Sequence, residues 1–373
     1  MDDEIIMSTR KTISTPAQPP QPVTDTSSPI TAIEPPNPNP TQPTPQGTPP
    51  LKELVKQYDS VSLLLQGGGA LGAYQAGIYE GLHKQGIKID RISGISIGAL
   101  NTAIIAGNRP ENRLAALQGF WNTITHRNYT PAGLNIYRQT ANELDKLSKI
   151  DMVSHFMPWI FENGFLKQQL RVMESTAEAW QTMIEGQRGF FKPRYFVPYD
   201  TTPNHLSYYT TDKLRETLER YCDLKLVNDV NRMKVSVSAV NVRNGNFAIF
   251  SNENEELHYD HFIASGALPP GFPAVEIDGE YYWDGGLVSN TPLNEILSHE
   301  EHLKQLIFQV DLWNAKGTVP ENMMEIDERI KDIQYSSKTR MVTDFMAQKL
   351  RYTRLIKELL KIIDDDAKID KVE

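Results

Sequence analysis

A glycine-rich stretch, GGGALG at residues 67–72, separates a short apolar run from a helix-like pattern. Gly67, Gly69 and Gly72 satisfy G-x-G-x-x-G, and a glycine turn between a strand and a helix brings main-chain N–H groups close to negative charge. The ligand could be a dinucleotide pyrophosphate, because Asp90 stands about 20 residues further on, where a ribose-binding acid would lie. It could also be the charged oxygen of a reacting ester, so both interpretations remain open at this motif.

A second glycine motif, GISIG, places a serine between a predicted strand and a predicted helix. Its serine is Ser96, and a sharp turn there would lift the hydroxyl out of the sheet, with Gly94 and Gly98 leaving room around it. The N-terminus of the following helix favours negative charge at this point. Ser96 could therefore attack an ester carbonyl, while N–H groups around Gly68 and Gly69 stabilise the oxyanion that forms.

A serine nucleophile needs a proton acceptor. None of the eight histidines lies in a glycine turn or beside a motif, whereas Asp284 precedes Gly285 and Gly286 in the stretch YYWDGG. This stretch could be an ordinary Asp-Gly turn, but the other two motifs favour a carboxylate base. The aromatic residues 281–283 could desolvate Asp284 and raise its basicity, although their alternation also fits plain strand packing.

The three motifs in this order, GGGALG, GISIG and DGG, resemble the patatin-like phospholipase family. The approach to the aspartate, ASGALPPGFPAVEIDGEYYWDGG at 264–286, is also similar to that family. The resemblance covers about residues 60–314, and the remainder resembles the C-terminal extension of a bacterial subgroup of patatin-like proteins. This sequence has DGG where many relatives have DGA. The second glycine does not touch the carboxylate, so we expect no loss of function from it.

The resemblance implies a fold and a chemistry. It implies an α/β fold, a three-layer α/β/α sandwich with a mostly parallel central sheet, followed by the helical C-terminal extension. It implies a Ser-Asp dyad without histidine, in which Ser96 is the nucleophile, Asp284 the base and the loop at 67–72 the oxyanion hole. Members of the family hydrolyse acyl esters of phospholipids, galactolipids or neutral lipids, and the dyad requires no metal and no cofactor. Two other interpretations remain, a catalytically silent scaffold and a dinucleotide-binding protein.

Hydrophobic periodicity predicts the elements that position these motifs, and strand–turn–helix units that repeat are typical of a mostly parallel sheet covered by helices. The expected elements are a strand at 60–65, a helix after the glycines that ends near Gly86, a strand at 87–93, a helix at 97–107, a hairpin at 235–252 that turns at Asn244-Gly245, a strand at 306–313 and helices from about 320 to the end.

Composition divides the chain into three parts. Residues 1–50 are rich in proline and polar residues and are expected to be a disordered tail. Residues 51–314 are expected to form the lipid acyl hydrolase domain, and 315–373 the helical extension. Within the hydrolase domain, aromatic-rich helices and loops at 108–210 are expected at one end of the sheet, as core packing or as a hydrophobic rim.

Charge and hydropathy limit the possible partners and locations. The net charge of -9 argues against a general nucleic-acid binder, and the single cysteine excludes an intramolecular disulfide. No stretch resembles a secretory signal, and the longest mainly apolar stretch, at 94–107, is too short to cross a bilayer. The expected partner is a lipid or ester substrate, and the expected location is the cytoplasm.

The C-terminal segment 338–361 combines an apolar stripe with seven basic and two acidic residues, a local charge of +5. A basic amphipathic helix of this kind can lie on an anionic membrane, so peripheral membrane contact is one expectation. The alternative is that the stripe packs on the domain and the charges are simply solvated. The acidic run at 364–366 would oppose an anionic surface.

Overall fold

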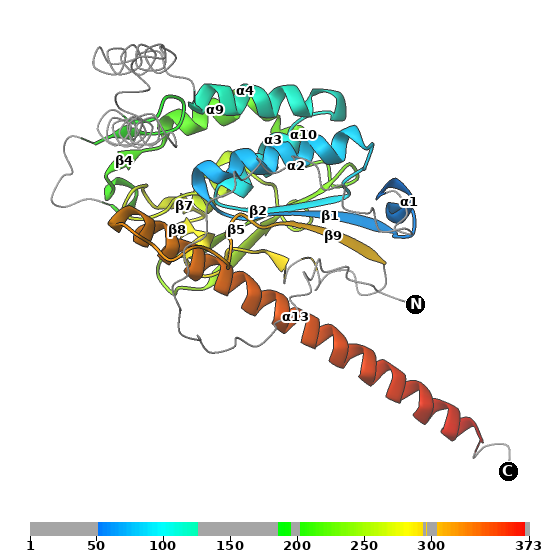
Figure 1. Cartoon of the computed structure of the whole chain (residues 1–373). Helices are drawn as coiled ribbons and strands as arrows, with labels where there is room; N and C mark the ends of the chain where they lie inside the picture. The colour runs from blue at the N-terminus through cyan, green and yellow to red at the C-terminus, as the bar shows by residue number, and fades with distance from the viewer. Residues whose placement is uncertain (1–50, 126–185, 195–201, 294–295, 297–303, 370–373) are drawn as a thin grey trace, which may run out of the picture.

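The computed structural model describes residues 51–125, 186–194, 202–293, 296 and 304–369 of the 373-residue chain, with the side chains of 324 and 362–369 left out (Figure 1). The expected tail at 1–50 lies outside the described residues, as does most of the aromatic-rich region at 108–210. The predicted boundary between 314 and 315 stays a prediction.

Seven described strands form one mixed sheet in the order β7-β8-β5-β2-β1-β9, with β6 paired to the long strand β5. The four strands β9, β1, β2 and β5 are parallel, and β6, β7 and β8 pair antiparallel. The bounds are β1 Ser60–Leu65, β2 Arg91–Ile95, β5 Lys234–Asn241, β6 Phe247–Ser251, β7 Val275–Ile277, β8 Glu280–Asp284 and β9 Gln305–Val310, and a separate pair joins β3 Lys192–Pro193 to β4 Tyr209–Thr210.

Helices cover the sheet from both sides (Figure 1). Helices α2, α3 and α4 lie on one side, and the first part of the long helix α13 lies on the other. The described helices of four or more residues are α1 Leu51–Val55, α2 Gly72–Lys84, α3 Ile97–Ala106, α4 Arg113–Thr125, α9 Asp212–Tyr221, α10 Leu224–Val227, α11 Tyr259–Ser265 and α13 Met323–Ile369. The expected α/β/α arrangement with a mostly parallel central sheet and a helical C-terminal segment is therefore confirmed.

Strand β1 shows why its sequence reads as an uninterrupted apolar run. Every one of its residues is buried, because the sheet is covered on both faces here. Leu63 and Leu65 pack into the main core with α2 and α3, while Leu64 points to the opposite face and packs with Ile296 and Met346. The second face is therefore closed in part by α13.

Local signals predicted several element ends well. The strand at 60–65 matches β1, the hairpin matches β5 and β6 with Gly245 at a φ of 71°, and Gly86 follows the end of α2 with a φ of 68°. Strand β2, however, begins at Arg91 and not at 87. Asp90 ends the preceding loop, because its N–H donates to the Val61 carbonyl (2.9 Å) and its carboxylate accepts from the Val61 N–H (3.0 Å).

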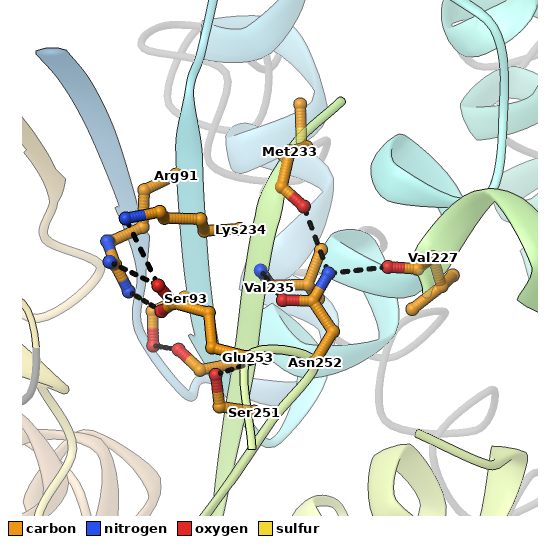
Figure 2. Close-up of polar contacts among 10 residues, drawn as sticks. Arg91, Ser93, Val227, Met233, Lys234, Val235, Ser251, Asn252 and Glu253 are labelled. Carbon is orange, nitrogen blue, oxygen red and sulfur yellow. Dashed lines mark hydrogen bonds and ion pairs between the residues drawn. The ribbon is translucent and has the colours of Figure 1, made fainter. Parts of the chain in front are cut away.

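A polar cluster connects β2, β5 and the end of β6, and it lies at the end of the sheet where β2 and β5 begin (Figure 2). The buried Arg91 guanidinium lies 2.7 Å from the Glu253 carboxylate, and Lys234 Nζ lies 3.1 Å from it. Burial favours the protonated form of Glu253, but its hydrogen bonds and charge pairs with these two cations outweigh burial and lower its pKa. Asn252 beside it donates to two carbonyls and accepts from the Val235 N–H.

Candidate active site

Ser96 occupies a strained turn between β2 and α3. Its φ is 57° and its ψ is -125°, a backbone conformation that L side chains rarely adopt and that costs on the order of 1–3 kcal/mol. The surroundings fix this turn, since the Ser96 N–H donates to Ser265 Oγ (3.0 Å) and Ser265 Oγ donates to the Ser238 carbonyl (2.7 Å). The first turn of α3 begins directly after Ser96, so the positive end of the helix dipole lies at this serine.

Two glycines let this turn fit against β1. A Cβ atom at Gly94 would overlap with the Gly98 carbonyl, and one at Gly98 would overlap with the Leu65 carbonyl. Only hydrogen atoms fit at these positions, because α3 crosses directly over the end of the neighbouring strand. The spacing of G-x-S-x-G is therefore required by the packing of this turn.

Asp284 is the last residue of β8 and lies beside Ser96. It pairs with Ala239 of β5, and its side chain is only 3% exposed. Its Oδ1 accepts a hydrogen bond from the Gly286 N–H (2.7 Å), and its carboxylate is hydrogen-bonded to the Ser96 side chain. Burial raises the pKa of Asp284 to about 6, while these two hydrogen bonds act in the opposite direction.

The glycine loop after β1 passes directly beside the serine. A Cβ atom at Gly67 would lie 3.0 Å from Ser96 Cβ and 2.5 Å from Asn290 Oδ1. Gly67 is buried, and its carbonyl accepts hydrogen bonds from Asn290 Nδ2 (3.0 Å) and Trp313 Nε1 (2.8 Å). The loop is thus held at a fixed distance from Ser96 by two side chains from the C-terminal third of the chain.

The next two glycines, Gly68 and Gly69, are half-buried and exposed, so their main chain is open to a ligand. Gly69 has a φ of 56°, which favours glycine, and lies at the surface at the start of a short 3-10 turn. Within the part of the chain that the structure describes, the N–H groups of Gly68 and Gly69 donate no hydrogen bond. Gly72 begins α2 and packs against Ile97. At Gly285, in the turn after Asp284, an added Cβ atom would lie only 2.6 Å from the Ser238 carbonyl oxygen.

The dinucleotide interpretation fails on the position of Asp90. Asp90 precedes β2, whereas the glycine loop follows the end of β1, and these parallel strands pair with Leu65 opposite Gly94. The aspartate therefore lies at the amino-terminal end of the parallel strands, and the glycine loop lies at their carboxyl-terminal end. The Asp90 carboxylate is also engaged, since it pairs with Lys88 at 2.8 Å.

The described histidines do not contact the serine. His261 is buried and accepts a hydrogen bond from the His258 N–H through Nδ1. The centroid of its ring lies 4.6 Å from that of Phe250 at a tilt of 52°, and burial lowers its pKa. Four of the eight histidines lie outside the described residues, namely His126, His155, His299 and His302. Among the described residues no group of three or more His, Cys, Asp or Glu side chains could hold a metal ion.

Sequence reasoning missed the side chains that hold the two loops together. Gln66, only 1% exposed, directly follows β1, and Asn290 and Trp313 bind the Gly67 carbonyl. The one available signal was Gln66 itself, a polar residue between an apolar strand and a glycine turn. Its partners lie more than 200 residues away in the sequence, at Thr291, Asp311 and Thr339.

A family model described as patatin-like phospholipase matches residues 63–297, more than half of the chain. The chain belongs to the patatin-like phospholipase family. A second model, described as patatin phospholipase, matches residues 333–372, which include the second half of α13. This patatin-like chain therefore carries two family signatures, one over the sheet and its site and one over the C-terminal helix.

Other similarities are weaker or shorter. Lysophospholipase nte1 of Aspergillus terreus is 53% identical to this patatin-like chain over 47 residues, which are 13% of the chain and 3% of that protein. VipD from Legionella pneumophila aligns over 72% of the chain and 52% of its own, at 18% identity and a TM-score of 0.33. Full-length ExoU of Pseudomonas aeruginosa, solved with SpcU, aligns over 72% and 47%, at 16% identity and a TM-score of 0.29. The chain thus spans about half the length of these two structures, and scores at this level add nothing to the family assignment.

Proposed function

We propose that this protein is a serine lipid acyl hydrolase that cleaves carboxylic esters of lipids. Ser96 is the nucleophile, Asp284 the base, and the loop Gly67–Gly72 the oxyanion hole. The observation that carries the proposal is a serine on a strained turn, hydrogen-bonded to a buried carboxylate whose pKa is about 6. A carboxylate with a pKa near 6 is a much better base than an ordinary aspartate and remains ionised at neutral pH.

The first half of the reaction forms an acyl-enzyme. Ser96 Oγ attacks the carbonyl carbon, and its proton passes to the Asp284 carboxylate as the new C–O bond forms. The carbonyl oxygen becomes an oxyanion, which the N–H groups of Gly68 and Gly69 can receive because they donate to no described residue. When the intermediate collapses, the bond to the leaving alcohol breaks, and the alcohol takes the proton from Asp284.

The second half releases the fatty acid. Water attacks the acyl-enzyme carbonyl and gives its proton to Asp284, and the same oxyanion loop stabilises the second tetrahedral intermediate. Collapse returns the proton to Ser96 Oγ and frees the acid. No metal or redox group takes part in either half, and Asp284 returns to its ionised state at the end of each cycle.

Hydrolysis of a soluble short-chain ester tests this mechanism. Ser96→Ala and Asp284→Ala should each remove nearly all activity, and the double variant should be little worse, because members of a catalytic unit are not additive. Wild-type-like turnover by Asp284→Ala would rule out the dyad. A folded wild type without turnover of any lipid ester would favour the silent scaffold.

The absence of a histidine base needs its own comparison. His299 and His302 are the residues that a Ser-Asp-His order would select, and both lie outside the described residues. We expect His299→Ala and His302→Ala to keep wild-type acylation of Ser96. Loss of acylation in either folded variant would replace the dyad by a triad.

We also propose that the second half of α13 binds the surface of an anionic bilayer. Figure 1 shows this half extending away from the sheet. Leu355, Ile356 and Leu359 are 47%, 56% and 58% exposed, and Leu359 follows the other two by four and three residues, which places it on the same face of the helix. The expectation that the apolar stripe packs on the domain is met only in the first half, where Val342 and Met346 pack under β1. None of the described helices is long and apolar enough to cross a membrane.

The charge around this exposed apolar face of α13 favours an anionic membrane over a second copy of the chain. Residues 349–361 contain five basic side chains and one acidic one, in a chain whose net charge is -9. Basic residues around an apolar stripe suit anionic lipid and would repel the same stripe of a second copy. We expect sedimentation with phosphatidylserine vesicles that weakens with salt, and loss of binding when Lys349, Arg351 and Lys357 become glutamate.

Turnover of the soluble ester should be unchanged in this triple variant. Equal vesicle binding by wild type and variant at low salt would contradict the membrane proposal. A concentration-dependent dimer without vesicle binding would assign the face to a second copy.

A further inference from the structure

One face of helix α13 is bound to the turn that carries the catalytic aspartate. Lys338 Nζ donates hydrogen bonds to the carbonyls of Gly286 (3.3 Å) and Leu287 (2.9 Å). These residues form the 3-10 turn that follows Asp284. The N–H of Gly286 in turn holds Asp284 Oδ1 at 2.7 Å. A chain of two contacts therefore leads from the lysine ammonium to the catalytic carboxylate through one residue.

The same helix face also reaches the oxyanion loop. The ring of Tyr335 stacks on Trp313 with 4.7 Å between their centroids, and Lys338 Nζ lies 5.6 Å from the Tyr335 ring. Trp313 Nε1 donates to the Gly67 carbonyl at 2.8 Å. Asp284 is close enough that its charge adds to burial in raising the pKa of Tyr335. The two loops of the site are thus supported from one side by a single stretch of helix.

A buried polar cluster fixes that stretch of helix in register. Gln66 Nε2 lies 2.8 Å from Thr339 Oγ1, 2.8 Å from Thr291 Oγ1 and 2.9 Å from the Asp311 carboxylate. Gln66 and Thr339 are 1% and 6% exposed. Separating Thr339 from this cluster would break its buried hydrogen bonds with Gln66 and Thr291, each worth about 0.5–1.5 kcal/mol. Lys338 is the neighbour of Thr339, so its position is fixed as well.

We propose that α13 belongs to the active site and that Lys338 is a positioning residue, which holds the turn after Asp284 so that the carboxylate faces Ser96. This inference rests on the proposed hydrolase function. Lys338 does not act on the carboxylate directly, since its two bonds go to main-chain carbonyls. Loss of the ammonium should release the turn and misplace the base, and misplacement by about 1 Å can cost about 100-fold in rate.

Replacement of Lys338 by cysteine, followed by chemical rescue, tests the proposal in the full-length protein. The chain has one other cysteine, Cys222, which is buried and has its pKa raised by that burial to about 12, so a thiol at 338 can be alkylated selectively. Reaction with 2-bromoethylamine displaces bromide and builds a thioether side chain with the length and ammonium of lysine. Reaction with iodoacetamide gives a neutral side chain on the same folded protein.

We expect Lys338→Cys to lower kcat for the soluble ester by about 10-fold or more, with KM within about twofold and a slower reaction of Ser96 with a fluorophosphonate. Aminoethylation should restore most of kcat, and carbamidomethylation should restore none. Arg340→Met, which removes an exposed positive charge two residues away, should behave as wild type.

Three results would overturn or separate the claims. Wild-type kcat in Lys338→Cys, or equal rates for the two alkylated proteins, would remove the positioning role. If Lys338→Cys does not fold, Lys338→Arg keeps two or more donors and should retain most of kcat, and a loss comparable to that of Asp284→Ala would contradict the proposal. Absence of turnover and of Ser96 labelling in wild type would instead defeat the proposed hydrolase function.

Discussion

The buried Asp284 carboxylate should make the native protein less stable at neutral pH, and replacing it with asparagine should remove that penalty. The pKa of Asp284 rises from 3.8 to about 6, chiefly through burial. Between about pH 4 and 6 the native state therefore holds a proton that the unfolded chain has released. In that window the free energy of unfolding falls as pH rises, because the native state binds more protons than the unfolded state.

The size of this effect follows from the shift. Each pKa unit corresponds to about 1.36 kcal/mol of unfolding free energy. A shift of about two units therefore lowers the stability of the native state by about 3 kcal/mol above pH 6, and this penalty disappears below about pH 4. Asparagine cannot ionise, and its amide oxygen can still accept from the Gly286 N–H. Asp284→Asn should thus be inactive but more stable than wild type at neutral pH.

Urea unfolding of both proteins at pH 4 and at pH 7.5 measures the prediction. The difference in unfolding free energy between Asp284→Asn and wild type should grow by about 3 kcal/mol from the lower to the higher pH, since all other titrating groups cancel. Asp344→Asn on the exposed side of α13 controls for the loss of a carboxylate as such. A difference that changes by less than about 1 kcal/mol would refute the argument that burial raises the pKa of this base.

Four further outcomes are expected. The kcat/KM for a soluble ester should fall below an apparent pKa of about 6, where Asp284 becomes protonated, and a flat profile down to pH 4.5 would exclude this carboxylate as the base. Gly98→Ala should destabilise the fold by about 2 kcal/mol or more in urea unfolding, because its Cβ would overlap with a carbonyl of β1. Cys222, with a pKa of about 12, should react with a disulfide reagent only after unfolding, and fast reaction of the native protein would contradict its burial. Glu253→Gln should lose about 2 kcal/mol at pH 7, because it removes the carboxylate that pairs with the buried Arg91. This loss should shrink as pH falls through the lowered pKa of Glu253, where the ionised form of Glu253 and its stabilisation disappear.

Sequence predicts best those helices and strands whose ends are set by residues close by in the sequence. Strand β1 is an apolar run buried on both faces, and Gly86 and Gly245 adopt the positive φ that ends a helix or turns a hairpin. Strand β2 begins later than its apolar pattern suggests, because Ile87 and Ile89 are buried in a loop and not in the ladder. Hydrophobic pattern reports burial, and it cannot say which buried residues pair in a sheet.

The site divides in the same way. Ser96 and Asp284 could be chosen from sequence because each stands in a turn whose glycines are required by close packing, at Gly94 and Gly98 for the serine and at Gly285 for the aspartate. The structure then shows that these two turns flank the same strand, β5, because Ile95 pairs with Ser238 and Asp284 pairs with its neighbour Ala239.

The support from α13 could not be predicted from sequence. Lys338 and Thr339 resemble any surface lysine and threonine of an amphipathic helix, and Gln66 lies 273 positions from Thr339. The amphipathic pattern of the helix allowed either packing on the domain or contact with a membrane, and it did not indicate which residues would face the site. Contacts of such long range leave no local pattern, so only the three-dimensional arrangement shows that this helix faces the site.

The account rests on Ser96 as a nucleophile activated by Asp284, and covalent labelling tests this claim most directly. A fluorophosphonate should add one phosphonyl group per native chain, and peptide mass spectrometry should place it on Ser96. Ser96→Ala should take up none, Asp284→Ala should react at least about 100-fold more slowly, and urea should abolish the reaction. A native wild type that leaves Ser96 unmodified, or that carries the group on another residue, would contradict the account.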